Sequence, residues 1–443
     1  MPHPPAQPAL VRLINMRAVF EVVHAEGPTT HPEIVQRTGL SKPTVSDVIS
    51  QLSERGLVRG VGRTSGRRGP TAQLYGVDPA AGWVLCLDVG REWLRSVVTD
   101  LSGAVVGRHA IPTPGGGAGA VIDQLRSTAR QAVAESGLSP EDVTQAVVGT
   151  PGVFRPGEDR FSLAPQLLGW ESATVTSEIR KVLVAPVGFE NDANLAALGE
   201  MTEGCARGRR DFVLLWVGTG VGMGVILDGA LRRGASGLAG EIGYLRLDPV
   251  PEAEQRTGAP PAWGAGAFEG QVSAQAVVEL AAELGVIGAD QPAAVFSAAR
   301  EGDPRARQVV DIEARRLAGA IASVSAVLDP ELVVLGGSVG AGGGDLLVAR
   351  LAEFLPLISP FSPQLASSAL GSEAVLVGAR ALGTRLALDR LLGVRGREPL
   401  AGDTRTGPSP VATPDGGGHH PGDGAFQKRR SPGLIPPGIP PSF

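Results

Sequence analysis

The sequence predicts an α/β protein that carries a small, mainly helical module at its N-terminus. From Gly82 to about Leu392, short apolar strands alternate with helical stretches, as in "AVVGTPGVF", "DFVLLWVGTGVGMGVILDGAL" and "ELVVLGGSVG". Before this region, residues 10–78 show helical periodicity, helix caps and a basic hairpin. A chain of 443 residues is too long for one ordinary core, so two or more domains are expected.

The composition is that of a globular protein. The chain is 43% hydrophobic and 19% charged with a net charge of −5, which excludes wholesale disorder and gives no overall attraction to nucleic acid. No apolar run could span a bilayer, and the N-terminus lacks the features of a secretory signal, so we expect a cytoplasmic location. Cys86 and Cys205 have no partner at metal-ligand spacing and are expected to be buried free thiols.

Residues 10–78 have the pattern of a winged helix-turn-helix. A first helix, "LVRLINMRAVFEVVHAEG", ends at a glycine, and two short helices then follow with a break at Gly39. Thr30 and Ser41 are suited to cap these helices, and a proline stands in the first turn of each. The second helix would enter the major groove of DNA. Its apolar face consists of Val45, Val48, Ile49 and Leu52.

A predicted hairpin after these helices carries Arg59, Arg63, Arg67 and Arg68 around a glycine-rich tip, as in a wing that contacts DNA phosphates. The module as a whole resembles a winged helix-turn-helix of the MarR-like sort. A helical protein-interaction domain with a solvated basic loop is the alternative. The expected DNA contacts are Ser41, Lys42, Thr44, Ser46 and Asp47 of the second helix together with Arg63, Arg67 and Arg68 of the wing.

In the α/β region, three glycine-rich turns each follow a strand, at Gly90, at Gly218–Gly224 and at Gly336–Gly340. Glycines at strand ends permit tight turns and the close approach of a phosphate or a sugar. The first turn contains Asp88 and then continues with Arg91, Glu92 and Trp93. A carboxylate and an indole are unusual in a phosphate-binding turn, and this raises the question whether a nucleotide still binds there.

Three motifs together closely resemble the ROK family of repressors and sugar kinases. They are "GTPG" (149–152), "FENDANLAALGE" (189–200) and "GTGVGMGVILDGALRRGASGLAGEIGY" (218–244). The resemblance implies an actin-like, two-lobed ATPase fold over residues 79–394, with a sugar bound in the cleft. Residues 1–9 and 395–443, the latter rich in glycine and proline, are expected to be flexible or disordered.

The resemblance also implies a set of sugar-binding residues. Asp192 corresponds to the family's general base toward a sugar hydroxyl, and its neighbour Asn191 offers both a donor and an acceptor. Glu241 and Glu269 stand where the family has sugar-binding glutamates. Gln166 replaces a common asparagine, and Tyr244 replaces the histidine of a "GEIGH" stretch.

Two departures from the family pattern bear on function. The histidine and three cysteines that commonly hold zinc in the family are absent, so no metal is expected. The phosphate turn, roughly Asp-x-Gly-Gly-Thr in the family's kinases, keeps Asp88 and Gly90 but has Glu92, which would repel phosphate, although Arg91 could partly compensate. The second loop, with Gly218, Thr219 and Gly220, is intact. These loops are interpreted as a vestigial nucleotide site, and Asp192 as a vestigial base.

The sequence therefore favours a sugar-responsive DNA-binding repressor that needs no cofactor and has no catalytic residue. A monosaccharide or phosphosugar in the cleft would alter affinity for an inverted-repeat operator, which a homodimer or higher oligomer would bind. An ATP-dependent sugar kinase with a DNA-binding module is the first alternative. A DNA-binding scaffold that has lost sugar binding is the second.

Overall fold

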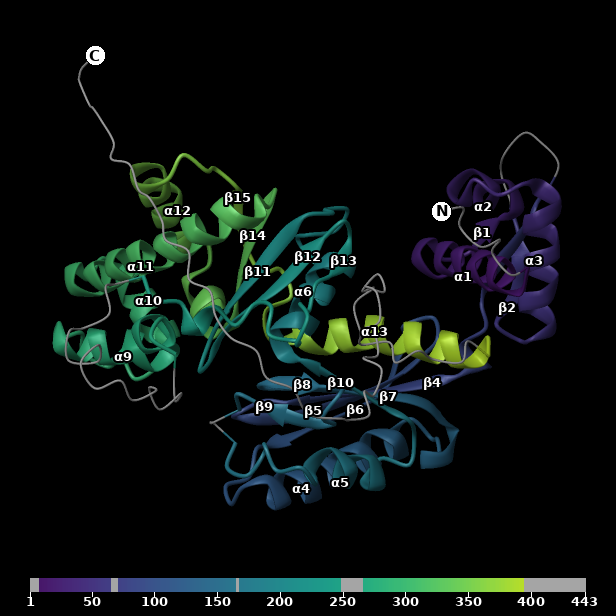
Figure 1. The fold of residues 1–443 in the computed structure, drawn as a ribbon, viewed down its shortest axis with the longest axis horizontal. Coiled ribbons are helices and arrows are strands. Elements are labelled where there is room, and N and C mark those ends of the chain that lie inside the picture. Colours follow the sequence, from purple (N-terminus) through teal and green to yellow (C-terminus); the bar gives the residue numbers. More distant parts are fainter. Residues whose placement is uncertain (1–7, 65–70, 165–166, 248–265, 394–443) are drawn as a thin grey trace, which may run out of the picture. The chain divides into compact units, whose positions relative to one another are not determined.

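The computed structural model describes residues 8–64, 71–164, 167–247 and 266–393 (Figure 1). The expected disordered tail, 395–443, lies outside them. No helix in the described ranges is long and apolar enough to cross a membrane. The described elements form an N-terminal helix-turn-helix module and two five-stranded sheets with their helices, as the predicted α/β fold class requires.

The N-terminal module is a helix-turn-helix followed by a hairpin, as predicted. Its core consists of buried side chains from all three helices, including Phe20, Ile34 and Leu52. A short strand after the first helix pairs with the second strand of the hairpin, which completes a three-stranded sheet. The elements are α1 (Pro8–Glu26), β1 (Thr29–Thr30), α2 (His31–Thr38), α3 (Lys42–Glu54), β2 (Val58–Arg63) and β3 (Gln73–Val77).

Local signals fix the turn between α2 and α3. The Glu33 carboxylate accepts hydrogen bonds from the Thr30 backbone N–H (2.8 Å) and hydroxyl (2.7 Å) at the start of α2. Gly39 ends α2 with φ of 69°, a left-handed conformation that favours glycine. Ser41 Oγ accepts the Thr44 N–H (3.3 Å) and caps α3. The predicted caps and the break at Gly39 are therefore confirmed.

The first sheet has the strand order β10-β7-β4-β5-β6, with β4, β5 and β6 antiparallel and β4, β7 and β10 parallel. Helices α4 and α5 cover one face, and α13 with α6 covers the other (Figure 1). A small hairpin, β8 with β9, follows β7. The bounds are β4 (Trp83–Val89), β5 (Trp93–Asp100), β6 (Val105–Pro112), α4 (Ala118–Glu135), β7 (Val143–Thr150), β8 (Val153–Arg155), β9 (Arg160–Ser162), α5 (Val175–Val182), β10 (Val187–Asn191), α6 (Asp192–Thr202) and α13 (Ala374–Leu391).

The second sheet has the order β13-β12-β11-β14-β15, in which β11, β14 and β15 are parallel. Because parallel strands end at the same edge, the loops after β11 and β14 meet there. The bounds are β11 (Phe212–Val217), β12 (Val221–Leu227), β13 (Ala230–Leu231), α8 (Glu269–Val272), α9 (Ala274–Glu283), α10 (Pro292–Glu301), α11 (Pro304–Leu328), β14 (Leu332–Gly336), α12 (Gly337–Ile358) and β15 (Gln364–Ser367), with short 3₁₀ turns at Pro79–Ala81, Pro140–Asp142, Ile242–Tyr244 and Gly371–Glu373.

Helix α13 makes contacts in two directions. It crosses α6 so closely that a Cβ atom on Gly378 would lie 1.8 Å from the Leu195 carbonyl oxygen. At its other end, Asp389 accepts a hydrogen bond from Arg17 of α1 (3.2 Å), and the Leu392 carbonyl accepts one from Arg55 (3.3 Å). The same helix therefore contacts both α6 and the helix-turn-helix module.

Candidate functional site

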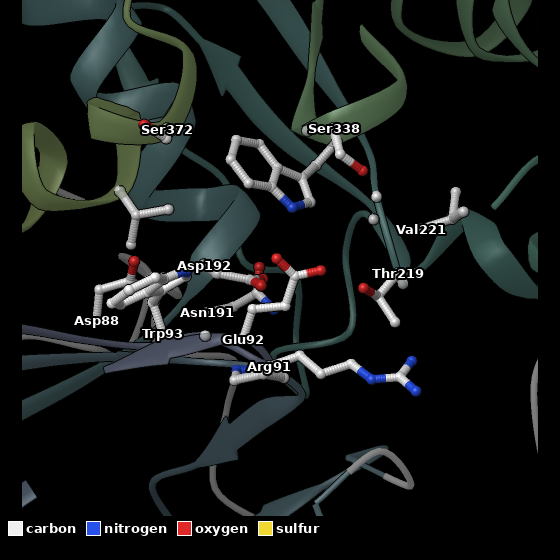
Figure 2. Close-up of a pocket in the computed structure, with 18 of the residues that line it drawn as sticks. Asp88, Arg91, Glu92, Trp93, Asn191, Asp192, Thr219, Val221, Ser338 and Ser372 are labelled. Carbon is white, nitrogen blue, oxygen red and sulfur yellow. The ribbon is translucent and has the colours of Figure 1, made fainter. Parts of the chain in front are cut away.

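A cavity of about 650 Å³ is lined by residues from both five-stranded sheets (Figure 2). The first sheet contributes the turn after β4 and the junction of β10 with α6. The second contributes the loops after β11 and β14 and the segment that holds Glu241 and Tyr244. Residues that are far apart in sequence thus meet in one place, and these include most of the residues predicted from the sequence.

Asn191 and Asp192 lie where strand β10 passes directly into α6. Asn191 is held in one orientation because its Oδ1 accepts the Asn194 N–H (3.2 Å) and its Nδ2 donates to the Gly152 carbonyl (3.1 Å). An amide has a second N–H and a second lone pair, so both can still serve a ligand. Asp192 Oδ1 accepts its own helix's Ala193 N–H at 2.8 Å. Burial raises the pKa of Asp192 to about 7, and nearby Asp88 adds to the rise.

Two glutamates approach from the second sheet. Burial and the charges of Asp192 and Glu269 raise the pKa of Glu241 to about 7. Glu269 accepts the Val221 backbone N–H at 3.0 Å, and burial also raises its pKa. Tyr244 lines the same cavity. The predicted sugar-binding residues therefore converge, with the exception of Gln166, which lies outside the described residues.

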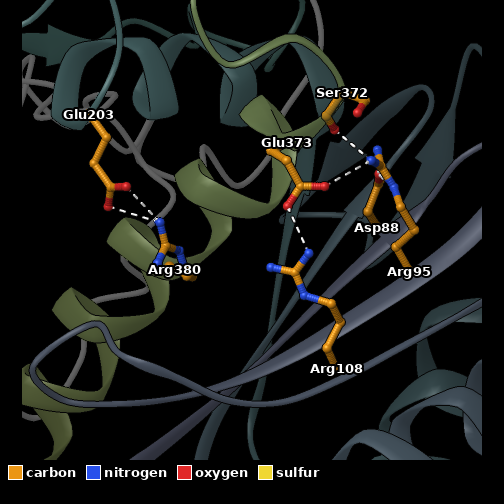
Figure 3. A network of polar contacts seen from close by, with 7 residues as sticks. All are labelled: Asp88, Arg95, Arg108, Glu203, Ser372, Glu373 and Arg380. Atoms are coloured by element: carbon orange, nitrogen blue, oxygen red, sulfur yellow. Dashed lines mark hydrogen bonds and ion pairs between the residues drawn. The ribbon is translucent and has the colours of Figure 1, made fainter.

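The turn after β4 holds an ion pair that was not predicted. The Arg95 guanidinium pairs with the buried Asp88 carboxylate and donates to the Ser372 carbonyl at 2.6 Å (Figure 3). Arg91 extends away from Asp88 (Figure 2). Sequence analysis missed Arg95, although a hairpin register would have placed it opposite Asp88, its cross-strand partner.

A second missed residue is Trp216, at the end of β11. Its indole packs against Gly336, where a Cβ atom would lie 3.0 Å from the ring, and it lines the cavity beside Ser338. Gly218, Thr219 and Gly220 also line the cavity, as do Asp88 and Gly90. Trp216 stands in the continuously apolar strand "FVLLWV", so no alternation of polar and apolar residues marked it as a cavity residue.

Gly224, in the same loop motif, has a different role from the one expected, whereas Gly222 lines the cavity. A Cβ atom on Gly224 would lie 2.4 Å from the Ala197 Cβ of α6, and one on Gly222 would lie 3.4 Å from the Ala193 Cβ. The contact at Gly222 is an ordinary van der Waals distance, whereas Gly224 is what lets β12 lie close to α6. Gly224 therefore serves helix–sheet packing and not a turn at the ligand.

The predicted DNA-contacting residues lie at the exposed start of α3 and in the hairpin. Ser41, Lys42, Ser46 and Asp47 are exposed, and Thr44 is half-buried with its hydroxyl 2.7 Å from that of Ser41. Arg59 and Arg63 of β2 are exposed, whereas Arg67 and Arg68 lie outside the described residues. The described candidates are thus presented on one helix end and the adjacent strand, an arrangement that suits groove and phosphate contacts.

Comparison with known families decides the identity of the larger module. The model of the ROK family matches residues 84–385, and that of the IclR helix-turn-helix domain matches residues 18–62. The chain belongs to the ROK family. The N-terminal module matches an IclR helix-turn-helix model, whereas the sequence had suggested a MarR-like one.

Relatives of this ROK protein include both kinases and repressors. A glucokinase of Halalkalibacterium halodurans is 30% identical over 318 residues, which cover 67% of this chain and 93% of the relative. A xylose repressor of Caldicellulosiruptor bescii is 25% identical over 361 residues, covering 78% and 88%. A solved ROK family transcriptional regulator, a homologue of the E. coli MLC protein, matches with a TM-score of 0.70 at 22% identity over 87% of this chain and 98% of that one, which shows the shared fold.

The charge of the ROK cavity is strongly acidic. Among the described residues, two guanidiniums line it, Arg91 and Arg95, and the first of these extends away from Asp88. Six carboxylates of the described residues line it as well: Asp88, Glu92, Asp192, Glu241, Glu269 and Glu373. Such a cavity suits a neutral ligand rich in hydroxyl donors and disfavours polyanions. Within the described residues, no three histidine, cysteine or acidic side chains are arranged to hold a metal ion.

Proposed function

We propose that the protein is a sugar-responsive DNA-binding transcriptional regulator that acts as a repressor. The observation that carries this proposal is the joining, in one chain, of a helix-turn-helix module to a ROK cleft whose phosphate turn is occupied by the Asp88–Arg95 ion pair. The kinship with a xylose repressor supports it. Because its partner is DNA, we place the protein in the cytoplasm.

In this proposal, a sugar ring binds between the two sheets. Asn191 and Asp192 hold it from one side, and Glu241 and Glu269 from the other. Sugar hydroxyls donate to ionised carboxylates, so binding favours the charged forms of Asp192 and Glu241. A ligand that contacts both lobes stabilises their closed arrangement, and only this difference in affinity between two states can change DNA binding.

Several features argue against phosphoryl transfer. Transfer needs cationic groups and a metal ion around the phosphates, because stabilising their charge is most of the catalysis. Here the Arg95 guanidinium is already paired with Asp88, and Glu92 adds negative charge beside the turn. The half-buried Trp216 and Ser338 also line the cavity. We therefore propose that Asp192 binds sugar without acting as a catalytic base.

A sugar kinase is the second candidate, and the 30% identity to a glucokinase favours it. ADP formation with ATP, Mg²⁺ and a panel of monosaccharides, together with calorimetric sugar binding, tests the choice. We expect sugar binding that Asp192→Asn weakens and no sugar-dependent ADP formation in either protein. Sugar-dependent ADP formation that Asp192→Asn abolishes would establish the kinase instead.

We further propose that the protein binds its operator as a homodimer or higher oligomer. A single helix-turn-helix reads one half-site, and two related by a two-fold axis read an inverted repeat. Base contacts would come from the exposed start of α3, and phosphate contacts from Arg59 and Arg63. Lobe closure would then change the spacing of the two modules on DNA.

A further inference from the structure

Two tryptophans from different sheets, Trp93 and Trp216, line the cavity. Trp93, the first residue of β5, has 49% of its surface exposed, yet it lines the cavity on the side of Asp88 (Figure 2). Trp216 belongs to the second sheet and rests on Gly336. An indole that lines a cavity offers a ligand a large apolar surface. No role in the proposed binding of a single sugar ring uses either indole.

The size and charge of the cavity restrict the class of ligand that could contact these two indoles. Its 650 Å³ lies in the range that holds drug-sized ligands, whereas one pyranose ring is a smaller molecule. The acidic lining disfavours a nucleotide or a phosphosugar. The Asp88 carboxylate, which could otherwise attract a cation, is engaged by Arg95. What remains is a neutral ligand with hydroxyl groups at one end and an apolar face at the other.

A second sugar ring has these properties. One face of a pyranose presents C–H bonds, and their weakly positive hydrogens are attracted to the negative face of an indole. We propose that the part of the cavity lined by Trp93 and Trp216 binds a second sugar ring, so that the effector is a neutral disaccharide or longer oligosaccharide. This inference rests on the proposed function, in which the first ring lies at Asp192.

Calorimetric titration of the full chain with matched sugars tests the proposal. The probes are glucose with cellobiose and maltose, and xylose with xylobiose. In at least one series, we expect a disaccharide to bind about tenfold more tightly than its monosaccharide, a typical effect of one stacked ring. Trp93→Ala should remove this advantage while it changes monosaccharide affinity by less than about twofold, and Trp93→Phe should keep most of it. Phe361→Ala, which removes another exposed aromatic residue, is the control and should change neither affinity.

The failures of the two proposals are distinguishable. If a monosaccharide binds and changes operator affinity, but no disaccharide binds more tightly, the second-ring site is refuted and the regulator stands. Equal losses for both sugars in Trp93→Ala also refute it, because the indole would then act on the first ring or on the fold. If no saccharide in the panel binds, both this inference and the sugar-responsive function are contradicted.

Discussion

At the scale of single residues, the Asp88–Arg95 pair marks the difference between this cleft and a phosphate-binding one. Asp88 is 4% exposed, so its carboxylate depends on Arg95 for a charged partner. Burial raises the pKa of Asp88, and the guanidinium opposes that rise. Arg95 also reaches across to Ser372 and Glu373, just before α13. One side chain therefore neutralises the turn and ties it to another part of the fold.

We predict that Arg95→Ala lowers the free energy of unfolding by about 2–4 kcal/mol, because it leaves a buried carboxylate without its partner. Urea denaturation measures this. Arg108→Ala is the matched control, since Arg108 contacts the same cluster only through Glu373 at 3.6 Å and is largely exposed (Figure 3); it should cost less than about 0.5 kcal/mol. Adding Asp88→Asn to Arg95→Ala should recover part of the loss. Equal effects of the two arginine variants would contradict the account.

The pKa of Asp192 gives a prediction with a defined sign. Its folded value of about 7 is above the ordinary value of 3.8. Ionisation therefore favours the unfolded chain, and the resulting penalty is absent at low pH, grows as pH rises from about 4 to 7, and is constant above. We expect Asp192→Asn to be more stable than the natural protein by on the order of 1 kcal/mol at pH 8, and by less at pH 5. A stability difference that is the same at both pH values would show that the Asp192 pKa is not raised.

At the scale of elements, the packing of α6 against α13 fixes the position of Asp192 in the cavity. Asp192 begins α6, and α6 lies against α13 through glycines on both helices, Gly199 and Gly378. A Cβ atom on Gly199 would lie 2.4 Å from the Ala374 carbonyl oxygen. The two backbones are therefore nearly in contact, and a shift of α6 on sugar binding must move α13 as well.

We predict that Gly378→Ala forces these helices apart and destabilises the protein by about 1–3 kcal/mol, despite the better helix propensity of alanine. Thermal or urea unfolding measures the change. Gly119→Ala in α4 is the matched control, because a Cβ atom there meets nothing within 4 Å; it should be neutral or stabilise by up to about 1 kcal/mol. Equal changes in the free energy of unfolding for the two variants would show that close packing of α6 and α13 does not contribute to stability.

The sequence predicts a helix end or a turn where the residues that determine it lie close to it along the chain. The caps at Thr30 and Ser41 and the left-handed Gly39 lie within a few residues of the helix ends that they define. The α6–α13 glycines carry no such signal, because the contact joins residues far apart in sequence. Arg95 is an intermediate case: the β4–β5 register determines its position opposite Asp88, but the residue lies two positions beyond the glycine-turn pattern that ends at Trp93. Trp216 and the packing role of Gly224 required the assembled sheets.

At the scale of the whole molecule, α13 offers a physical connection between the cleft and the helix-turn-helix module. Asp389 of α13 accepts a hydrogen bond from Arg17 of α1, and Arg55 donates hydrogen bonds to the carbonyls of Leu391 and Leu392. The cleft residues at the start of α6 are thus linked through helix packing to α1. A two-state change that moves α13 would act on the DNA-binding module through these contacts.

We predict that Asp389→Ala weakens this coupling without removing either binding function. Operator affinity without sugar should change by less than about twofold, whereas the change in affinity that sugar causes should fall several-fold. Fluorescence anisotropy on labelled DNA gives both quantities. Arg37→Ala is the control, because the ion pair of Arg37 with Glu26 lies inside the helix-turn-helix module. An undiminished sugar effect in Asp389→Ala would exclude this contact from the mechanism.

The central claim is that sugar in the ROK cleft controls DNA binding without phosphoryl transfer. The most direct test is anisotropy of the full chain on DNA that flanks its own gene, with each sugar of the panel added singly and no ATP present. We predict that at least one sugar changes the DNA affinity, and that Asp192→Asn reduces this response. Tight DNA binding that no sugar alters in the absence of ATP would contradict the claim.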